Sequence, residues 1–462
     1  MTSEELFMDR RSFLKSTAAS VAGLTIAELT DALPRAEAVV APNKAFEIAK
    51  IERVTVKVPF REVPRRNMFR EIPHWMYSEI FTVTLRSGHV GHGETLLYYT
   101  WGATTDQDVN RAQGRNAVEL MWDDELGSGL QMALFDAVAT ASGVPVYALI
   151  GTRVNDRTPL AWWNIDTSPE DMASECRTAY EQGYLAYKTK GRPWFDVWEM
   201  CEATSKAVPE EFHIALDFND TLLTAERGLP ILKELEAKYP QIAIWETPIF
   251  QDDIPGNQAI RANSKIPVAH HYGNPDAHVA ILNKVCDGFV IGGGASRIRN
   301  RGTVAEMADM PFWLQLVGTG IMATWSKHFG AVLSHSTWPA VNCHQLYEHQ
   351  LLVEPVKVEK GFSNIPSGPG LGCEIDWAAV EKYRVPKPPR RPEPKRLIET
   401  KWPDGRTMFT ANDGTVNFML RAGQQAKMPY FERGVFTQLV ADDGSEKWKQ
   451  RHAKAQSGPF IE

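Results

Sequence analysis

Short apolar segments alternate with helical stretches seven times between Pro159 and Pro339, and this alternation limits the possible folds more than any other feature. The segments are PLAWWNI, LAYKTK, FHIALDFN, IAIWETP, IPVAHH, GFVIGG and FWLQLVG. Strands that alternate with helices form parallel sheets, because each helix carries the chain back across one face of the sheet. The sequence therefore predicts an α/β protein with a parallel β/α barrel over residues 156–340.

Three further parts are predicted on either side of the barrel. Residues 45–155 contain strand-like runs and then helical spacing, which is typical of a small α+β domain. The turn-rich residues 341–384 would close the barrel and return to that domain. Residues 385–462 begin with a Pro-rich basic linker and hold many large apolar side chains. We expect this extension to be ordered and to cover either the barrel of its own subunit or that of a neighbour. A neighbouring subunit of a homo-oligomer is the favoured surface, where the extension would also narrow the mouth of the barrel.

The N-terminal segment has the features of an export signal. It contains RRSFLK, then a mildly apolar stretch and an A-x-A cleavage candidate that ends at Ala38. We interpret residues 1–38 as a twin-arginine signal, with a basic amphipathic helix as the alternative. This interpretation predicts a periplasmic or extracellular protein. No stretch approaches the roughly 20 consecutive apolar residues that a membrane span requires.

Net charge and cysteine content exclude two classes of protein. The 462 residues carry a net charge of −7, and the pI is near 6.0. Such a charge gives no basis for binding a polyanion, so nucleic acid is not an expected partner. The five cysteines are far apart and odd in number, which indicates neither a zinc knuckle nor a disulfide framework.

Charged and polar residues close the predicted strands. Functional groups of a β/α barrel lie at the C-terminal ends of its strands, so these residues should meet at one mouth. Any one of them alone could be a solvated surface residue, but the ordered set indicates a site. In chain order they are Trp163, Asn164, Lys188, Lys190, Asp217, Asn219, Glu246, His270 and His271, followed by Gly292 and Gly318.

The lysines and carboxylates of this set predict proton transfer next to a carboxylate. Asp217 and Glu246 end neighbouring strands and offer the oxygen ligands that a hard divalent ion prefers. Lys188 and Lys190 lie on the same side of their strand, where each should lower the other's tendency to be protonated. One of them could then act as a base near neutral pH. A divalent ion on the substrate carboxylate would stabilise the enediolate formed when the α-proton leaves.

These strand ends resemble those of a known family. YKTK, ALDFND, WETP and IPVAHH, in that order, are similar to the K-x-K, D-x-N, E-x-P and metal-ligand strands of the mandelate racemase and muconate lactonizing branch of the enolase superfamily. SGHVGHGET and QMALFDAVATASGVPVYALIG resemble the capping domain of that family, and GPGLGCEID resembles its closing segment. The resemblance covers about residues 45–384. It implies a modified (β/α)7β-type barrel with an N-terminal α+β capping domain.

The resemblance also implies roles for individual residues. Lys190 would be the base, Lys188 would help to hold the substrate carboxylate, and Asp217 and Glu246 would bind Mg²⁺. The expected partner is therefore a small-molecule carboxylate.

The chain departs from the family pattern at the third metal ligand. His271 occupies the place of a carboxylate, and Tyr272 and His270 are the alternatives. We expect His271 to face the metal and His270 to face the other side, and a non-ligand role for both histidines stays open. Imidazole is a poorer ligand for Mg²⁺ than carboxylate, so Mn²⁺ or another divalent ion is the alternative metal.

A second departure concerns the opposite face of the substrate. Gly292 and Gly318 stand where a racemase or cycloisomerase would place a second acid-base residue. Glycine cannot transfer a proton, so we expect a lyase or dehydratase that acts on a sugar acid or related hydroxy acid. The alternatives are a catalytically altered member that binds a carbohydrate or acid, and a racemase or cycloisomerase with a rearranged second base.

Residues of the capping domain should set specificity. FREVPRRNMFREIPHW and LLYYTWGATTD combine arginines with aromatic rings, which suits a sugar-like anion. Solvated loop arginines are the alternative interpretation. The predicted substrate-binding residues are Asn219, Arg61, Tyr98, Trp101 and Trp163.

Overall fold

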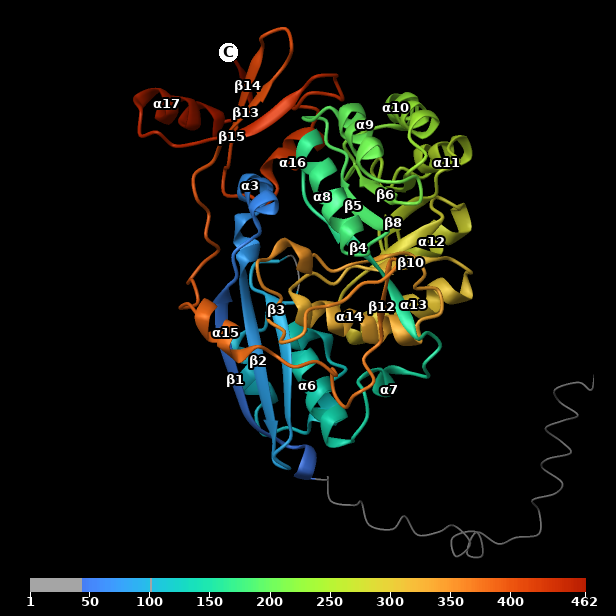
Figure 1. The fold of residues 1–462 in the computed structure, drawn as a ribbon, viewed down its shortest axis with the longest axis vertical. Coiled ribbons are helices and arrows are strands. Elements are labelled where there is room, and N and C mark those ends of the chain that lie inside the picture. The colour runs from blue at the N-terminus through green and yellow to red at the C-terminus, as the bar shows by residue number, and fades with distance from the viewer. Residues whose placement is uncertain (1–43, 100–101) are drawn as a thin grey trace, which may run out of the picture. The chain divides into compact units, whose positions relative to one another are not determined.

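The computed structural model describes residues 44–99 and 102–462. The twin-arginine signal expected over residues 1–38 and the candidate substrate-binding residue Trp101 lie outside the described residues. Residues 45–462 form one compact unit, whose ribbon is drawn in Figure 1. Within the described ranges, no helix combines the length and the apolar character that crossing a membrane would require.

The N-terminal part of this unit, the capping domain, is built on a three-stranded antiparallel sheet covered by α6 (Ser128–Ala141). A Cβ on Gly91 would lie 2.1 Å from the backbone nitrogen of Ala137, so the close approach of helix and sheet requires glycine. Gly91, in the motif SGHVGHGET, thus allows the sheet to pack tightly against α6. The strands, in order across the sheet, are β1 (Ile48–Lys57), β2 (Tyr77–Leu85) and β3 (Val90–Leu96).

The barrel contains all seven predicted strands. An eighth, β11 (Ala340–Val341), runs parallel to the first, and a bridge between Gln315 and Val341 joins the two ends of the sheet. The predicted α/β fold with a nearly closed parallel barrel is therefore confirmed. The seven strands are β4 (Arg157–Trp163), β5 (Ala186–Lys190), β6 (His213–Asp217), β7 (Ile242–Glu246), β8 (Val268–His271), β9 (Gly288–Ile291) and β10 (Phe312–Leu314).

Capped helices follow the barrel strands. The side chains of Ser168, Asp196, Thr224 and Asp253 accept backbone N–H groups in the first turns of α8, α9, α10 and α11. Each cap fixes where the loop after a strand ends, and these loops hold the candidate site. The helices are α8 (Pro169–Glu181), α9 (Val197–Ala207), α10 (Ala225–Lys238), α11 (Ile254–Asn263), α12 (Ala277–Asn283), α13 (Ala295–Met307) and α14 (Gly320–Val332).

A buried carboxylate joins the capping domain to the barrel. Glu94 of β3 accepts hydrogen bonds from the Ser78 hydroxyl at 3.0 Å and from the Thr319 backbone N–H at 2.9 Å. The Thr319 hydroxyl and the Met322 backbone N–H also donate to it. A Cβ on Gly318 would lie 3.0 Å from a Glu94 oxygen and 2.7 Å from the Met322 side chain. Gly318 is therefore needed for the contact between the two domains.

The C-terminal extension is folded, as its apolar side chains predict. Its small sheet has a core that includes Phe409 and Trp448. Helix α16 (Phe418–Gln424) packs toward the barrel of the same chain (Figure 1). The strands, in order across this sheet, are β15 (Phe436–Val440), β13 (Leu397–Lys401), β14 (Thr407–Ala411) and β16 (Phe460–Ile461), with α17 (Glu446–Ala455) beside them.

Candidate active site

A pocket of about 220 Å³ opens at the C-terminal ends of the barrel strands. All three parts of the described chain contribute to its lining. The capping domain supplies aromatic and aliphatic side chains, the barrel supplies the charged strand ends, and the extension supplies part of α16. A second cavity of about 180 Å³ near the other end of the barrel is almost wholly apolar, so the candidate site is the pocket at the mouth.

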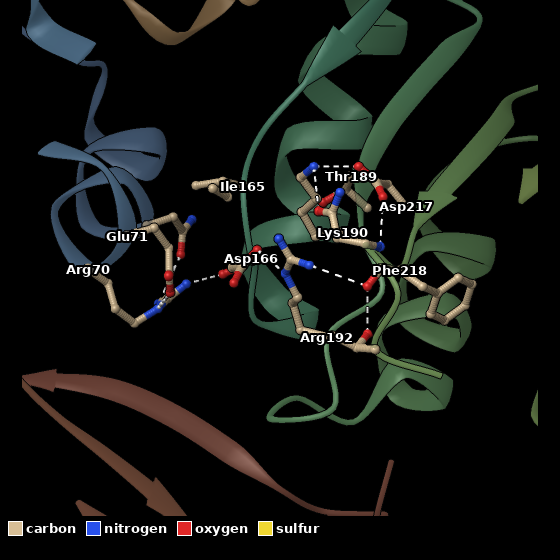
Figure 2. Close-up of polar contacts among 12 residues, drawn as sticks. Arg70, Glu71, Ile165, Asp166, Thr189, Lys190, Arg192, Asp217 and Phe218 are labelled. Carbon is tan, nitrogen blue, oxygen red and sulfur yellow. Dashed lines mark hydrogen bonds and ion pairs between the residues drawn. The ribbon is translucent and has the colours of Figure 1, made fainter. Parts of the chain in front are cut away.

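Four charged side chains from three adjacent strands meet at this pocket: Lys188 and Lys190 line it, and the fully buried Asp217 and Glu246 contact Lys188. Lys190 lies opposite Asp217, and Asp217 lies opposite Glu246, in the parallel register of β5, β6 and β7. The Lys188 ammonium lies 3.0 Å from Asp217 Oδ2 and 2.9 Å from Glu246 Oε2. Lys190 also pairs with Asp217 and donates to Asn219 Oδ1 at 2.9 Å (Figure 2). The structure therefore brings together the four residues that the strand ends indicate.

The two lysines differ in their pKa values. Burial lowers the pKa of Lys190 to about 8, and the positive charges of Lys188 and Arg192 act in the same direction. Burial also disfavours the charged form of Lys188, but the charges of Asp217 and Glu246 outweigh it and raise the pKa of Lys188 above its usual value. Lys188 lowers the pKa of Lys190 as expected, but the pKa of Lys188 itself rises because the two carboxylates dominate its surroundings. Lys190 is the lysine suited to act as a base near neutral pH.

Of the three candidates for a third ligand, His271 alone approaches the carboxylates. Its Nε2 lies 3.1 Å from Glu246 Oε1, and its side chain is 44% exposed at the pocket. His270 points to the other side of β8, where its Nε2 lies 3.1 Å from Asn257 Oδ1. Tyr272 packs its ring against Phe289.

These residues fit a divalent ion by the chemistry of their donor atoms. Both side-chain oxygens of Glu246 are buried and accept no hydrogen bond, although Lys188 and His271 lie within ion-pair distance. A buried carboxylate of this kind is suited to bind a cation. The described residues contain no ready-made cluster of three or more His, Cys, Asp or Glu ligands. Asp217 and Glu246 are therefore the donors that would hold an ion, with His271 beside them.

The pocket also has polar groups of weaker acid-base character in its lining, from the residues that follow the strands β10 and β11 and from the capping domain. They are Gln315, Cys343 and Tyr99. Burial raises the pKa of Tyr99 to about 12 and raises that of Cys343 further above its usual value. Gly292, at the end of β9, contributes only its backbone, and its carbonyl oxygen accepts a hydrogen bond from Arg301. Neither Tyr99 nor Cys343 is suited to accept a proton at neutral pH.

Two of the predicted substrate-binding residues line the pocket and two do not. Trp163 and Asn219 line it. Arg61 instead forms a bidentate ion pair with Glu175 of α8, at 3.1 and 2.6 Å. The Tyr98 hydroxyl donates to the carbonyl oxygen of Pro388 at 3.0 Å. Both side chains are held in contacts between parts of the chain, away from the pocket lining.

Several lining residues were not predicted from the sequence. Trp75 stacks on Trp163 with ring centroids 5.6 Å apart and, with Tyr99, forms an aromatic wall. Arg192 is 3% exposed and continues the two-residue spacing of Lys188 and Lys190, which was its signal in the sequence. No sequence signal indicated the lining residues from α16, Asn417 and Leu420.

Comparisons with known proteins identify a family over part of the chain and several relatives. Residues 171–379 match the family described as "Enolase C-terminal domain-like". Muconate cycloisomerase 1-2 of Acinetobacter lwoffii is 24% identical over 269 residues, which are 56% of this chain and 69% of the relative. Arabinonate dehydratase of Saccharolobus solfataricus is 22% identical over 333 residues, which are 64% of this chain and 88% of the relative. Other relatives include a D-galactonate dehydratase and an N-succinylamino acid racemase.

The fold has matches among solved structures. A muconate cycloisomerase from Pseudomonas fluorescens superposes with a TM-score of 0.61 at 20% identity, covering 74% of this chain and all of that chain. Members of the enolase superfamily generally depend on Mg²⁺. Residues 171–379 belong to the enolase C-terminal domain-like family, and the chain has relatives in the mandelate racemase and muconate lactonizing branch of the enolase superfamily.

Proposed function

We propose that this protein is an enzyme that removes the proton α to a carboxylate and then eliminates a β-hydroxyl group, as a dehydratase of a sugar acid or related hydroxy acid. The observation that carries the proposal is the position of Lys190, a pocket-lining lysine with a lowered pKa that lies beside the buried carboxylates of Asp217 and Glu246. The sequence similarity to an arabinonate dehydratase and a D-galactonate dehydratase supports the same type of reaction.

A divalent ion held by Asp217, Glu246 and His271 would bind the substrate carboxylate and stabilise the negative charge of the enediolate. Mg²⁺ is the first choice because of the two carboxylates, and Mn²⁺ the second because of the imidazole. Lys188 stays protonated, since its pKa is raised, and would donate to a substrate oxygen. Lys190 is part of the time neutral near its pKa of about 8 and would accept the α-proton.

The one-sided arrangement of acid-base groups favours elimination over racemisation. Racemisation needs a competent base on each face of the planar intermediate. Apart from the lysines, Arg192 and the candidate ligand His271, the titratable groups that line the pocket are Tyr99 and Cys343, both with raised pKa values. A syn elimination needs acid-base help on one face only. Lys190, once protonated, could return its proton to the departing hydroxyl group, which then leaves as water.

Incubation in D₂O tests this proposal. With D-galactonate or D-arabinonate as probe, purified protein with Mg²⁺ or Mn²⁺ should exchange or eliminate from one configuration at the α-carbon only. Lys190→Ala should abolish the reaction, whereas Lys233→Ala on the exposed face of α10 should leave it unchanged. Equal exchange from both epimers would show that a second base exists.

A binding protein without turnover is the second candidate. One observation favours it: the Lys188 ammonium already contacts both Asp217 and Glu246, so an internal cation can neutralise the carboxylates. Calorimetric titration with Mg²⁺ and Mn²⁺ separates the two candidates. If neither ion binds, the enediolate mechanism is ruled out and the binding function remains.

A further inference from the structure

The C-terminal extension contributes to the pocket although it lies outside the region that matches the family model. We propose that α16 is the specificity-determining wall of the site, and that Asn417 and Leu420 contact the part of the substrate that lies away from the reacting carboxylate. Both residues line the same pocket as Lys190 and Asn219.

The wall is attached to the loop that follows the ligand strand β6. Gln424 of α16 donates to the backbone oxygen of Asn219 at 3.1 Å and to Asp220 Oδ2 at 3.2 Å. The Tyr430 hydroxyl donates to the carbonyl oxygen of Leu222 at 3.0 Å. Because Asn219 itself accepts a hydrogen bond from Lys190, α16 lies one residue away from the proposed base.

The extension also contacts the loop that follows β5. A Cβ on Gly423 would lie 3.0 Å from the ring of Trp194, so α16 rests directly on that indole. The Thr437 hydroxyl donates to the Trp194 carbonyl oxygen at 2.7 Å, and the Gly434 N–H donates to Asp196 Oδ2 at 2.7 Å. These contacts fix α16 against the segment that carries Arg192.

A third set of contacts reaches the capping domain. Arg396 donates to the carbonyl oxygen of Arg70 at 3.0 Å, and its guanidinium lies 5.1 Å from the ring of Phe418 in α16. Arg70 belongs to α3 (Glu62–Glu71) and donates to the carbonyl oxygen of Asp166. The Asp166 carboxylate accepts from Arg192 Nε at 2.9 Å (Figure 2). Extension, capping domain and pocket are thus joined by continuous polar contacts.

The side chains near this wall indicate the kind of group that it recognises. Arg192, Asn219 and Asn417 offer a guanidinium and two amides, which bind hydroxyl or carboxylate oxygens. Leu420 offers an apolar surface between them. The far end of the substrate should therefore carry oxygens, as a polyhydroxy acid or a diacid does. This assignment rests on the proposed function, whereas the position of the wall does not.

Competitive acetylation tests the position of the wall without substrate or metal. Leu420→Ala should raise the labelling of Lys190 by acetic anhydride severalfold relative to the exposed Lys233 in the same sample, and Leu420→Trp should lower it. Gln425→Ala, an exposed position at the C-terminus of α16, is the matched control and should change nothing. Unchanged Lys190 labelling in both Leu420 variants would overturn the proposal.

Substrate preference tests the specificity role. Proton exchange in D₂O is compared for D-arabinonate, D-galactonate and galactarate in the wild type and in Leu420→Ala and Asn417→Gly. Glycine is used because Asn417 has a φ of 55°. The ratio of the kcat/KM values for two of these acids should differ about tenfold between each variant and the wild type. This is the effect expected when roughly one side-chain contact with the substrate is lost. An unchanged ratio would overturn the specificity role. If no acid exchanges in the wild type, the proposed function fails, and the acetylation result still decides the wall.

Discussion

Replacing Asp217 with asparagine should destabilise the protein even without metal or substrate. The carboxylate is buried and is shared by the ammonium groups of Lys188 and Lys190. Asparagine has nearly the same volume, so the variant removes charge without opening a cavity. Loss of one member of a buried ion pair costs about 3–5 kcal/mol, because the remaining charge is uncompensated. Lys190 can release its proton near pH 8 and Lys188 keeps Glu246, so we expect the lower end, about 3 kcal/mol.

Urea unfolding of metal-free protein at pH 7 measures this loss, with tryptophan fluorescence as the signal. The control is Glu202→Gln, which breaks a surface pair with Lys206 and should leave the free energy of unfolding almost unchanged. Adding Lys190→Met to Asp217→Asn should recover part of the loss, because it removes the cation whose carboxylate partner is gone. A loss below about 1 kcal/mol, or strictly additive single effects, would refute the reasoning.

Three further predictions concern acid stability, metal choice and the extension. Burial lowers the pKa of His328 and His344 to about 3. Each histidine therefore contributes its full stabilisation above about pH 6.5, where it is neutral in the unfolded chain as well. As the pH drops from there toward 3, the unfolded chain takes up the proton, and the free energy of unfolding falls by about 1.4 kcal/mol per pH unit for each histidine. His328→Gln should flatten the dependence of unfolding free energy on pH between 4 and 6, and an unchanged slope would contradict this. His271→Ala should weaken metal binding less than Glu246→Ala does, as measured by calorimetric titration with Mg²⁺ and Mn²⁺. If the His271→Ala variant keeps both the affinity and the preference between the two ions, His271 is not a ligand. Limited trypsin digestion should spare residues 390–462 as long as the barrel, whereas rapid cleavage throughout that range would disprove a docked extension.

The strand ends could be placed from the sequence because two rules act on them together. Topology brings the C-terminal ends of parallel strands to one mouth, and the two-residue alternation decides which side chains share a side. Lys188, Lys190 and Asp217 obey both rules. Residues of the loops after the strands, such as the unpredicted Arg192, are not bound by the strand alternation. Composition alone could not tell that Tyr98 turns away from the pocket while its neighbour Tyr99 lines it.

The contribution of the extension could not be predicted for a different reason. Its apolar side chains indicate that it must cover a surface, but they do not identify the surface. The hydrogen bond from Gln424 ends on a backbone carbonyl oxygen of Asn219, a group that every residue possesses. Such a contact leaves no pattern in the sequence of either partner. Only the folded chain reveals that α16 meets the loops after β5 and β6.

The span of the pocket lining along the chain has a consequence for biosynthesis. Side chains as far apart as Ile72 and Leu420 face the same pocket. Loops of that length are costly in entropy to close, and contacts between distant segments form late in folding. A nascent chain on the ribosome can assemble the barrel while the pocket still lacks one side. Ligand binding should therefore emerge only after α16 has been synthesised and has settled beside Asn219.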